Sequence, residues 1–268
     1  PGLVPWQYIF ARGLTIFIVL NLYLYFEEGK NFLKNYLKVG VSGLIGGCGL
    51  GLAMITFIYS ITHTTAAITL LCLAAMPFFT ALLGFLFLKE KISFNVLIAI
   101  VIATIGIIII ALGNTEKNSI IGLIFGMTSS IGFSIFSVSL RWRKETPKFT
   151  TVAIAGLFCV VIALTFIAIN ESTILSTSYN GALFSLHGTI VCMGLILYSI
   201  GSRAIPAAEL TLLSLTEVIG GIFWVWLPLF GINEVPSTNT IIGGFFLFMS
   251  IIYYSLTIKS NRRFIALN

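Results

Sequence analysis

The sequence contains little charge. Only 9% of its 268 residues are Asp, Glu, Lys or Arg, whereas soluble domains carry about 25%. Hydrophobic residues make up 58% of the chain, and the mean hydropathy is +1.06. A soluble globule of this composition would expose mostly apolar surface, so the composition excludes that class of protein.

The motifs of several enzyme classes are also missing. The chain has no Walker A sequence, no G-x-S-x-G and no H-E-x-x-H, and its two histidines, His63 and His187, lie at the ends of different apolar stretches. The four cysteines lie inside apolar stretches without C-x-x-C spacing, which is typical of packing residues rather than metal ligands or disulfides. We therefore expect no enzymatic activity, no cofactor, no bound metal and no ATP hydrolysis by this chain.

What the sequence has instead is nine apolar stretches, each about twenty residues long. They cover residues 5–26, 39–61, 66–88, 93–112, 120–140, 149–169, 181–201, 207–230 and 239–258. Each can cross a hydrocarbon core of about 30 Å as a helix that rises 1.5 Å per residue. Strands of a transmembrane barrel would alternate apolar and polar residues, and Val101 to Leu112 does not. The expected fold class is an all-α polytopic membrane protein with nine transmembrane helices.

Thirteen of the fifteen Lys and Arg residues fall in alternate loops, on one side of the predicted membrane. They are Lys30, Lys34, Lys38, Lys89, Lys91, Arg141, Arg143, Lys144, Lys148, Arg203, Lys259, Arg262 and Arg263. Positive loops stay in the cytoplasm, which predicts a multi-pass protein of the plasma (inner) membrane with a cytoplasmic C-terminus. Because these basic residues are scattered among short loops, we expect the lipid bilayer as a partner and no nucleic acid.

The first residue, Pro1, falls on the predicted outer side of the membrane. The chain begins with Pro rather than Met, and no signal peptide precedes the first apolar stretch. The simplest explanation is a further helix upstream of Pro1. We therefore expect a parent protein with ten helices and both ends in the cytoplasm, of which this chain is a truncated copy.

Short sequence matches recur in the same order in the two halves of the chain. Tyr59-Ser60-Ile61 recurs as Tyr198-Ser199-Ile200, Thr69–Leu73 as Thr211–Leu215, and Lys89-Glu90 as Asn233-Glu234. The shift is five helices, so the two copies have opposite orientations, as in many secondary transporters. The predicted repeats are residues 1–114, without a first helix, and residues 119–258, followed by a cytoplasmic tail at 259–268.

Small residues recur at helical spacing in two of the stretches. Gly43, Gly47 and Gly51 share a face in the second stretch, and the fifth carries Gly122, Gly126, Ser130 and Ser134 at steps of four. Such faces let helix backbones approach closely in a membrane, so we interpret both as packing seams. In the third stretch Pro77 removes a backbone hydrogen bond and predicts a kink.

A further set of segments in both halves forms a recognisable pattern. In the second half they are Ile205-Pro206-Ala207-Ala208-Glu209, Leu215-Thr216-Glu217-Val218, Trp224-Val225-Trp226, Glu234-Val235-Pro236-Ser237 and Ile242-Gly243-Gly244. In the first half they are Ala66-Ala67, Pro77 and Lys89-Glu90-Lys91-Ile92, and Arg12 follows Pro5. These segments resemble EamA-type transporters of the drug/metabolite transporter superfamily, and Arg12 is similar to an arginine often found in that family's second helix. The sequence departs from the family at Asn233, where Gly is usual, and at Val218, where Pro is common. The resemblance implies ten helices in two inverted five-helix halves, and substrates such as amino acids, amines and other small metabolites, often exported.

The sharpest candidate for a functional residue is Glu217. It lies ten residues into the stretch that starts at 207, and therefore about 15 Å deep, close to the membrane midplane. A step of 100° per residue places it on one stripe with Thr216 and Trp224, and also with Glu209. A carboxylate at this depth usually contacts a substrate or carries a coupling proton. The alternative is a Glu that is hydrogen-bonded to neighbouring helices for packing alone.

Arg12 is the second charged candidate, about 10 Å below the predicted outer face. It could line a cavity and bind an anionic group of the substrate, extend to the membrane interface, or pair with Glu217. Tyr8, one turn earlier, and Trp6 are aromatic residues near the membrane boundary, where interfacial anchoring is common. They are also candidates for the border of an outer entrance.

Together these patterns predict a secondary transporter, a permease that exports small metabolites by alternating access, with a cavity between the two repeats. The expected partners are a small-molecule substrate, the bilayer, and protons as a candidate coupling ion. Two alternatives stay open at this point. One is a passive facilitator or channel, although no selectivity filter or ring of charges is visible. The other is an intramembrane enzyme, although the residues that such an enzyme needs are missing.

Overall fold

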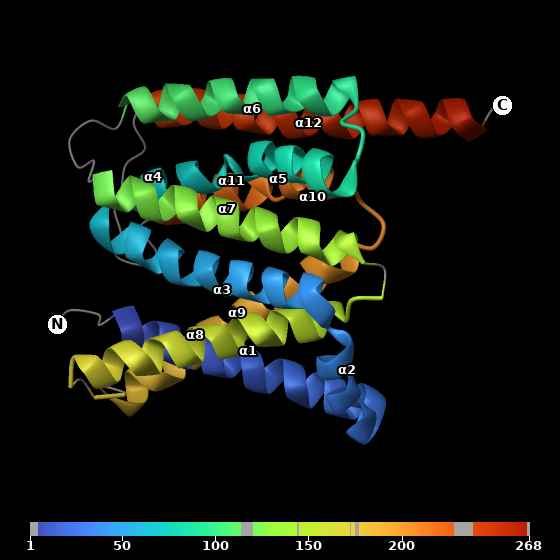
Figure 1. Ribbon diagram of the computed structural model, residues 1–268. Coiled ribbons are helices and arrows are strands. Elements are labelled where there is room, and N and C mark those ends of the chain that lie inside the picture. The colour runs from blue at the N-terminus through green and yellow to red at the C-terminus, as the bar shows by residue number, and fades with distance from the viewer. Residues whose placement is uncertain are drawn as a thin grey trace.

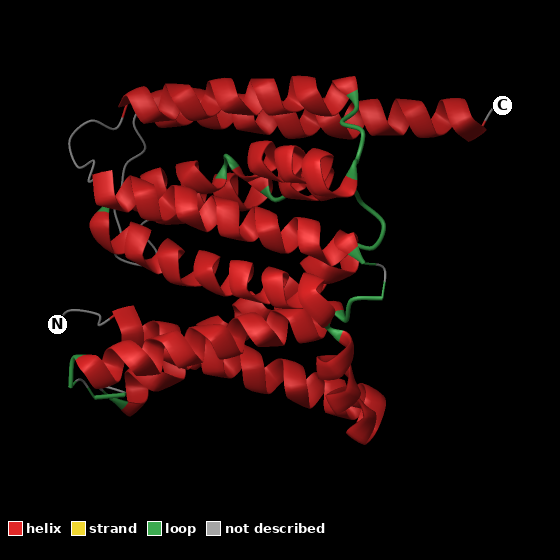
Figure 2. Cartoon of the chain, viewed as in Figure 1, coloured by secondary structure: helices red, strands yellow, loops and turns green. Residues whose placement is uncertain are grey.

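A computed structural model describes residues 5–113, 120–143, 145–171, 173–174, 177–227 and 238–266. In these residues the chain is built from helices and contains no strand (Figures 1 and 2). The elements are α1 (Pro5–Glu28), η1 (Gly29–Phe32), α2 (Leu33–Lys38), α3 (Gly40–His63), α4 (Ala66–Leu73), α5 (Met76–Leu83), η2 (Gly84–Leu88), α6 (Phe94–Gly113), α7 (Ile120–Trp142), α8 (Lys148–Ile169), α9 (Ser178–Gly201), α10 (Ala207–Leu213), α11 (Leu215–Trp226) and α12 (Thr238–Ala266).

The all-α polytopic class is confirmed. The described helices make nine passes, with α4, α5 and η2 forming one and α10 and α11 another. Six of the passes are long and apolar enough to cross a membrane. The helices α6 and α12 contain shorter apolar segments, Phe94–Ile109 and Ile241–Thr257. The predicted end of the last helix at residue 258 was too early, because α12 continues to Ala266. No Gly or Pro follows residue 258 to stop it.

The basic loops meet at one end of the helix bundle (Figure 1). At this end α1, α7, α9 and α12 finish, and α3, α6, α8 and α10 begin. We call it the basic end, because it holds Lys30, Lys34, Lys38, Lys89, Lys91, Arg141, Arg143, Lys148 and Arg203. The basic residues that the sequence places in alternate loops therefore lie together at one end of the folded bundle.

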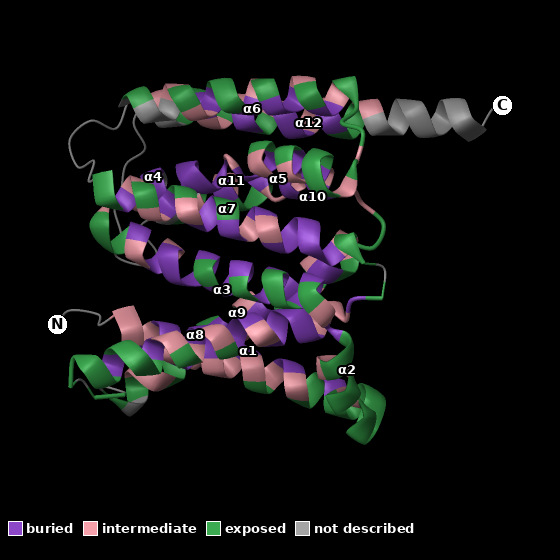
Figure 3. Cartoon of the chain, viewed as in Figure 1, coloured by how far each residue is buried: buried purple, intermediate pink, exposed green. Residues whose placement is uncertain are grey.

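The helices pack around two clusters of buried apolar residues. One cluster joins α1, α3 and α8, with Ile16, Leu50 and Val152 in its centre, and the other joins α4, α6 and α12. Phe57 and Phe133 contact both clusters. Figure 3 shows buried residues concentrated on α3 and α7, the central helices, and exposed residues on α2 and along α6. The core therefore lies where helices of both halves of the chain meet.

The predicted seams are packing seams in the structure. A Cβ atom added to Gly47 would lie 2.6 Å from Ile154 and 3.0 Å from the Thr151 carbonyl on α8. On the other side of α3, at a contact outside the two predicted seams, a Cβ atom on Gly132 of α7 would lie 2.6 Å from the Gly49 carbonyl. Glycine is needed at these positions because the neighbouring backbone occupies the space of a side chain.

The break at Pro77 is also confirmed, and α7 compensates for it. The helix is interrupted between α4 and α5, at Ala74 and Ala75, and Pro77 is the second residue of α5. Ser130 donates a hydrogen bond to the Cys72 carbonyl, and Ser134 donates one to the Met76 carbonyl at 3.2 Å. The serines of the predicted stripe therefore satisfy carbonyl groups near the break, which would otherwise be costly in an apolar environment.

A second break, which the sequence did not predict, divides the expected helix 207–230 at Ser214. There α10 ends and α11 begins, and the Glu217 amide donates to the Ser214 carbonyl at 2.9 Å. The Ser214 hydroxyl bonds back to the carbonyls of Leu210 and Thr211, both at 3.1 Å. Hydroxyl groups that bond to the preceding turn bend helices, which accounts for a break without proline. Residues 228–230 and the Asn233-Glu234 match lie outside the described residues.

Candidate functional site

Arg12 lies inside the bundle. Its side chain is 3% exposed, and Nη2 donates a hydrogen bond to the Met54 carbonyl of α3 at 2.8 Å. Its Nε atom is buried without a hydrogen-bond partner, and Arg12 forms no ion pair with any described residue. A buried guanidinium usually pairs with a carboxylate, because taking a charge out of water is costly. This arginine therefore has unused capacity to bind an anionic group.

Tyr8 and His187 complete a small polar cluster around Arg12. Positions 8 and 12 share a face of α1 because they are four residues apart. The Arg12 guanidinium lies 5.2 Å from the centroid of the Tyr8 ring, and the Tyr8 hydroxyl shares a hydrogen bond with His187 Nδ1 on α9. Close approach of α9 requires Gly188, where an added Cβ would lie 3.1 Å from the Arg12 carbonyl. We call Tyr8, Arg12 and His187 the Arg12 cluster.

Glu217 occupies a different place, on α11 directly after the break at Ser214. Its side chain is exposed, and its carboxylate forms no hydrogen bond or ion pair with the part of the chain that the structure describes. It lies close enough to Tyr198 of α9 for the two groups to interact electrostatically. Tyr198 itself donates to the Ser137 hydroxyl of α7 at 2.7 Å. Neither the Arg12–Glu217 ion pair nor a packing hydrogen bond to Glu217 is formed within these residues.

The two other predicted residues of α11, Thr216 and Trp224, are also exposed. The Thr216 hydroxyl donates to the Leu213 carbonyl at 2.9 Å, and the Trp224 ring lies beside Phe223. Glu209 does not share their wall, because it belongs to α10 and accepts a hydrogen bond from Tyr254 of α12. The sequence analysis placed Glu209 and the α11 residues on one stripe by assuming a continuous helix. The break at Ser214 interrupts the helical periodicity, so they do not share a face. The structure thus unites Tyr8 with Arg12 and places the α11 residues separately.

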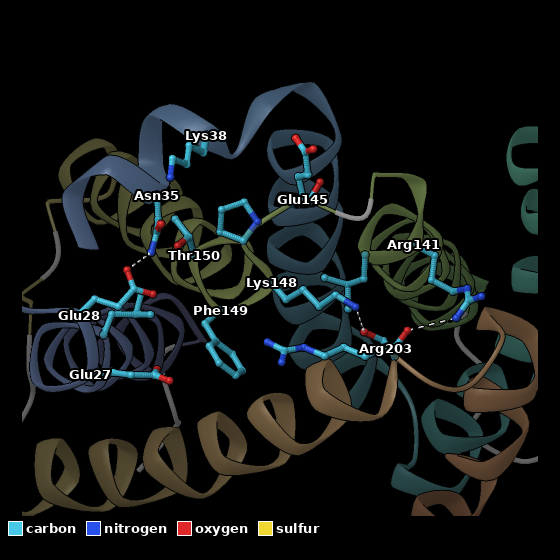
Figure 4. Close-up of a pocket in the computed structure, with 15 residues that line it drawn as sticks. Glu27, Glu28, Asn35, Lys38, Arg141, Glu145, Lys148, Phe149, Thr150 and Arg203 are labelled. Atoms are coloured by element: carbon cyan, nitrogen blue, oxygen red, sulfur yellow. Dashed lines mark hydrogen bonds between the residues drawn. The ribbon is translucent and has the colours of Figure 1, made fainter. Parts of the chain in front are cut away.

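A polar cavity of about 610 Å³ lies at the basic end of the bundle (Figure 4). It is formed by the ends of α1, α2, α7 and α9 and by the start of α8, and its lining includes Glu27, Glu28, Arg141, Lys148 and Arg203. The sequence analysis did not predict it. The available signal was the excess of charge in these loops, but which loops meet could not be read from the sequence.

Comparison with known proteins shows which part of the chain resembles a known family. Residues 2–112 match the EamA-like transporter family. The match covers less than half of the chain, so the chain is similar to that family over its first part, and its helices are those of a multi-pass membrane protein. Its relatives include an uncharacterized transporter of Helicobacter pylori, 30% identical over 155 residues that cover 58% of this chain and 51% of the relative. The chain thus spans about half the length of that relative.

Two further comparisons extend over more of the chain. The pseudopaline exporter CntI of Pseudomonas aeruginosa is 25% identical over 221 residues, which cover 81% of this chain and 75% of the exporter. A crystal structure of a protein with 15% sequence identity superimposes with a TM-score of 0.72, covering 97% of this chain and 90% of its own. At that identity the structural match shows a shared fold, and the helical architecture is therefore common to both proteins.

Proposed function

We propose that this chain functions as a secondary transporter that exports small metabolites, such as amino acids or amines, by alternating access. The match of residues 2–112 to a transporter family and the similarity to a protein named as an exporter support this proposal. We further propose that the protein resides in the plasma (inner) membrane, with the basic end and the C-terminus in the cytoplasm. The grouping of basic residues at one end supports that orientation.

The observation that carries the proposal is the buried guanidinium of Arg12. A charge inside a bilayer is costly, and it usually faces a pathway or a partner. Arg12 has a carbonyl partner but no carboxylate partner among the described residues, and its Nε atom is unsatisfied. A substrate carboxylate would satisfy it. Tyr8, whose ring lies beside the guanidinium, is placed to contact the same substrate.

The proposed mechanism uses two repeats of opposite orientation, residues 1–114 and 119–258, with the substrate between them. Discontinuous helices at corresponding positions of two halves mark the binding region in many transporters. Here the interrupted helices α4–α5 and α10–α11 contact one another, α4 with α11 and α5 with α10. Glu217 follows one of these breaks, where its carboxylate would bind the amine of a substrate or carry a coupling proton. Thr216 and Trp224 would contribute to the same wall.

The test is ligand-dependent thermal stability of the purified chain in detergent. We would screen amino acids, polyamines and nucleosides against the wild type, Arg12→Gln and Glu217→Gln, with Glu171→Gln as a matched control at an exposed carboxylate. A ligand at a hundred times its dissociation constant adds about 2.7 kcal/mol to the free energy of unfolding. We expect one chemical class to stabilise the wild type and the control, but neither of the other two variants.

Counterflow of the same ligand in proteoliposomes then tests transport itself. Stabilisation that persists in Arg12→Gln would remove Arg12 from the binding site, and loss of stabilisation in Glu171→Gln would show that the effect is not specific. Binding without counterflow would contradict the transporter proposal while leaving the binding site intact.

A further inference from the structure

The cavity at the basic end has two walls of opposite charge. Lys148 from the start of α8 and Arg203 from the turn after α9 lie on one side, and Glu27 and Glu28 from the last turn of α1 lie on another (Figure 4). Along α1, residues 24 to 28 are about 20 Å from Arg12 at 1.5 Å per residue. The cavity is therefore separate from the Arg12 cluster.

The cationic wall lacks an anionic partner. The Lys148 ammonium donates to the Ser202 hydroxyl at 3.0 Å, and the Arg203 guanidinium lies 5.9 Å from the centroid of the Phe149 ring. Neither residue forms an ion pair within the described part of the chain, where Arg141 pairs with Glu90 instead. Lys148 is close enough to Arg203 and to Arg141 for its charge to be repelled by both. Lys148 and Arg203, two neighbouring cations without an ion-pair partner among the described residues, favour an anionic ligand.

The start of α8 adds hydrogen-bond donors to this wall. Pro147 is the N-cap residue and provides no side-chain cap, and the first amide bonded to it is that of Thr151. The amides of residues 148–150 have no partner among the described residues. Thr150 lines the cavity and is fully buried, and its hydroxyl has no hydrogen-bond partner in the described structure. Uncapped amides at a helix N-terminus bind anions well, and a buried unsatisfied hydroxyl is costly.

We propose that this cavity is a binding site for an oxyanion that also carries an amine. Lys148, Arg203 and the start of α8 would bind the phosphate or carboxylate, and Glu27 would bind the amine. The volume of about 610 Å³ suits a small molecule rather than a single ion. Two sources share this chemistry, namely a soluble amino-phosphate or amino acid and the headgroup of an aminophospholipid. The site is independent of whether the protein transports the ligand.

The experiment measures binding of O-phosphoethanolamine and of inorganic phosphate to the full chain, purified in detergent and stripped of lipid. The variants are Lys148→Met, Arg203→Gln and Glu27→Gln, and the matched control is Lys34→Gln, an exposed lysine at the same end that does not line the cavity. We expect Lys148→Met and Arg203→Gln to weaken both ligands about tenfold, as the loss of a charge-assisted hydrogen bond implies. Glu27→Gln should weaken phosphoethanolamine and strengthen phosphate.

A second arm tests the lipid source. Phosphatidylethanolamine and phosphatidylglycerol that remain bound to the wild type and variants in mixed-lipid nanodiscs would be quantified by mass spectrometry. Binding of the soluble ligand with the expected variant pattern supports a soluble source, and selective retention of phosphatidylethanolamine that is lost in Lys148→Met supports a lipid source. The oxyanion site is refuted if neither soluble ligand binds and phosphatidylethanolamine is not selectively retained, or if Lys148→Met and Arg203→Gln behave like Lys34→Gln. Equal responses of both soluble ligands to Glu27→Gln would refute the amine contact.

Discussion

Substitution of Gly132 by Ala tests a close backbone contact between α3 and α7. An added Cβ atom would lie 2.6 Å from the Gly49 carbonyl oxygen, 3.1 Å from the Ala53 amide nitrogen and 3.2 Å from the Ala53 Cβ atom. Carbon and carbonyl oxygen atoms normally approach to about 3.3 Å, so α3 and α7 must separate by roughly 0.7 Å. None of the three contacted atoms can rotate away, because two belong to the backbone and the third is attached directly to it.

The cost follows from this separation. A gap of about 0.5–1 Å forfeits a quarter to a half of the van der Waals attraction along the seam, and overpacking typically costs about 1–3 kcal/mol. Ala has a better helix propensity than Gly, which offsets up to about 1 kcal/mol of this destabilisation. We therefore expect Gly132→Ala to lower the free energy of unfolding by about 1–2 kcal/mol, which lowers the midpoint temperature by roughly 2–4 °C per kcal/mol in a chain of this size.

The matched control is Gly194→Ala, on α9, where an added Cβ atom has no neighbour within 4 Å. This substitution should leave the midpoint temperature unchanged or raise it, because only helix propensity changes. Both variants would be unfolded thermally in the same detergent and monitored by size-exclusion chromatography. A midpoint temperature for Gly132→Ala equal to or above that of Gly194→Ala would refute the close-packing argument.

Three further substitutions probe other contacts. Ser134→Ala removes a buried hydrogen bond to the Met76 carbonyl at the α4–α5 break. Thermal unfolding should show that the free energy of unfolding falls by about 0.5–1.5 kcal/mol; an unchanged value would mean that this carbonyl needs no partner. Glu90→Gln breaks the partly exposed ion pair with Arg141 and leaves the Arg141 bonds to the Ser202 and Ile205 carbonyls in place. We expect the free energy of unfolding to fall by at most about 1 kcal/mol, and by less at high salt; a loss independent of salt would contradict this. Tyr8→Phe removes the hydrogen bond to His187 but keeps the ring beside the Arg12 guanidinium. We expect the free energy of unfolding to fall by about 1 kcal/mol in Tyr8→Phe and by more in Tyr8→Leu; equal losses would argue against a stabilising contact between the ring and Arg12.

The membrane-spanning architecture could be predicted from the sequence because its causes are local. Hydropathy over about twenty residues decides whether a segment can cross a bilayer, and eight of the nine predicted starts lie within one residue of an observed helix start. The seams at Gly47 and Ser134 followed from helical spacing, and the break near Pro77 from the missing amide. In each case the pattern that predicts the feature lies within one segment of the chain, although the groups that it contacts are far away in the sequence.

Only the tertiary structure decided which polar groups meet. Tyr8 and His187 are 179 residues apart in the sequence, and no local sequence pattern predicts their contact. The break at Ser214 divided a helix that hydropathy read as continuous, and it separated Glu209 from Glu217. The cavity between Lys148 and Glu27 depends on the ends of α1, α2, α7 and α9 and the start of α8 lying side by side. Composition and periodicity fix what each segment is, whereas a binding site depends on long-range packing that brings distant segments together.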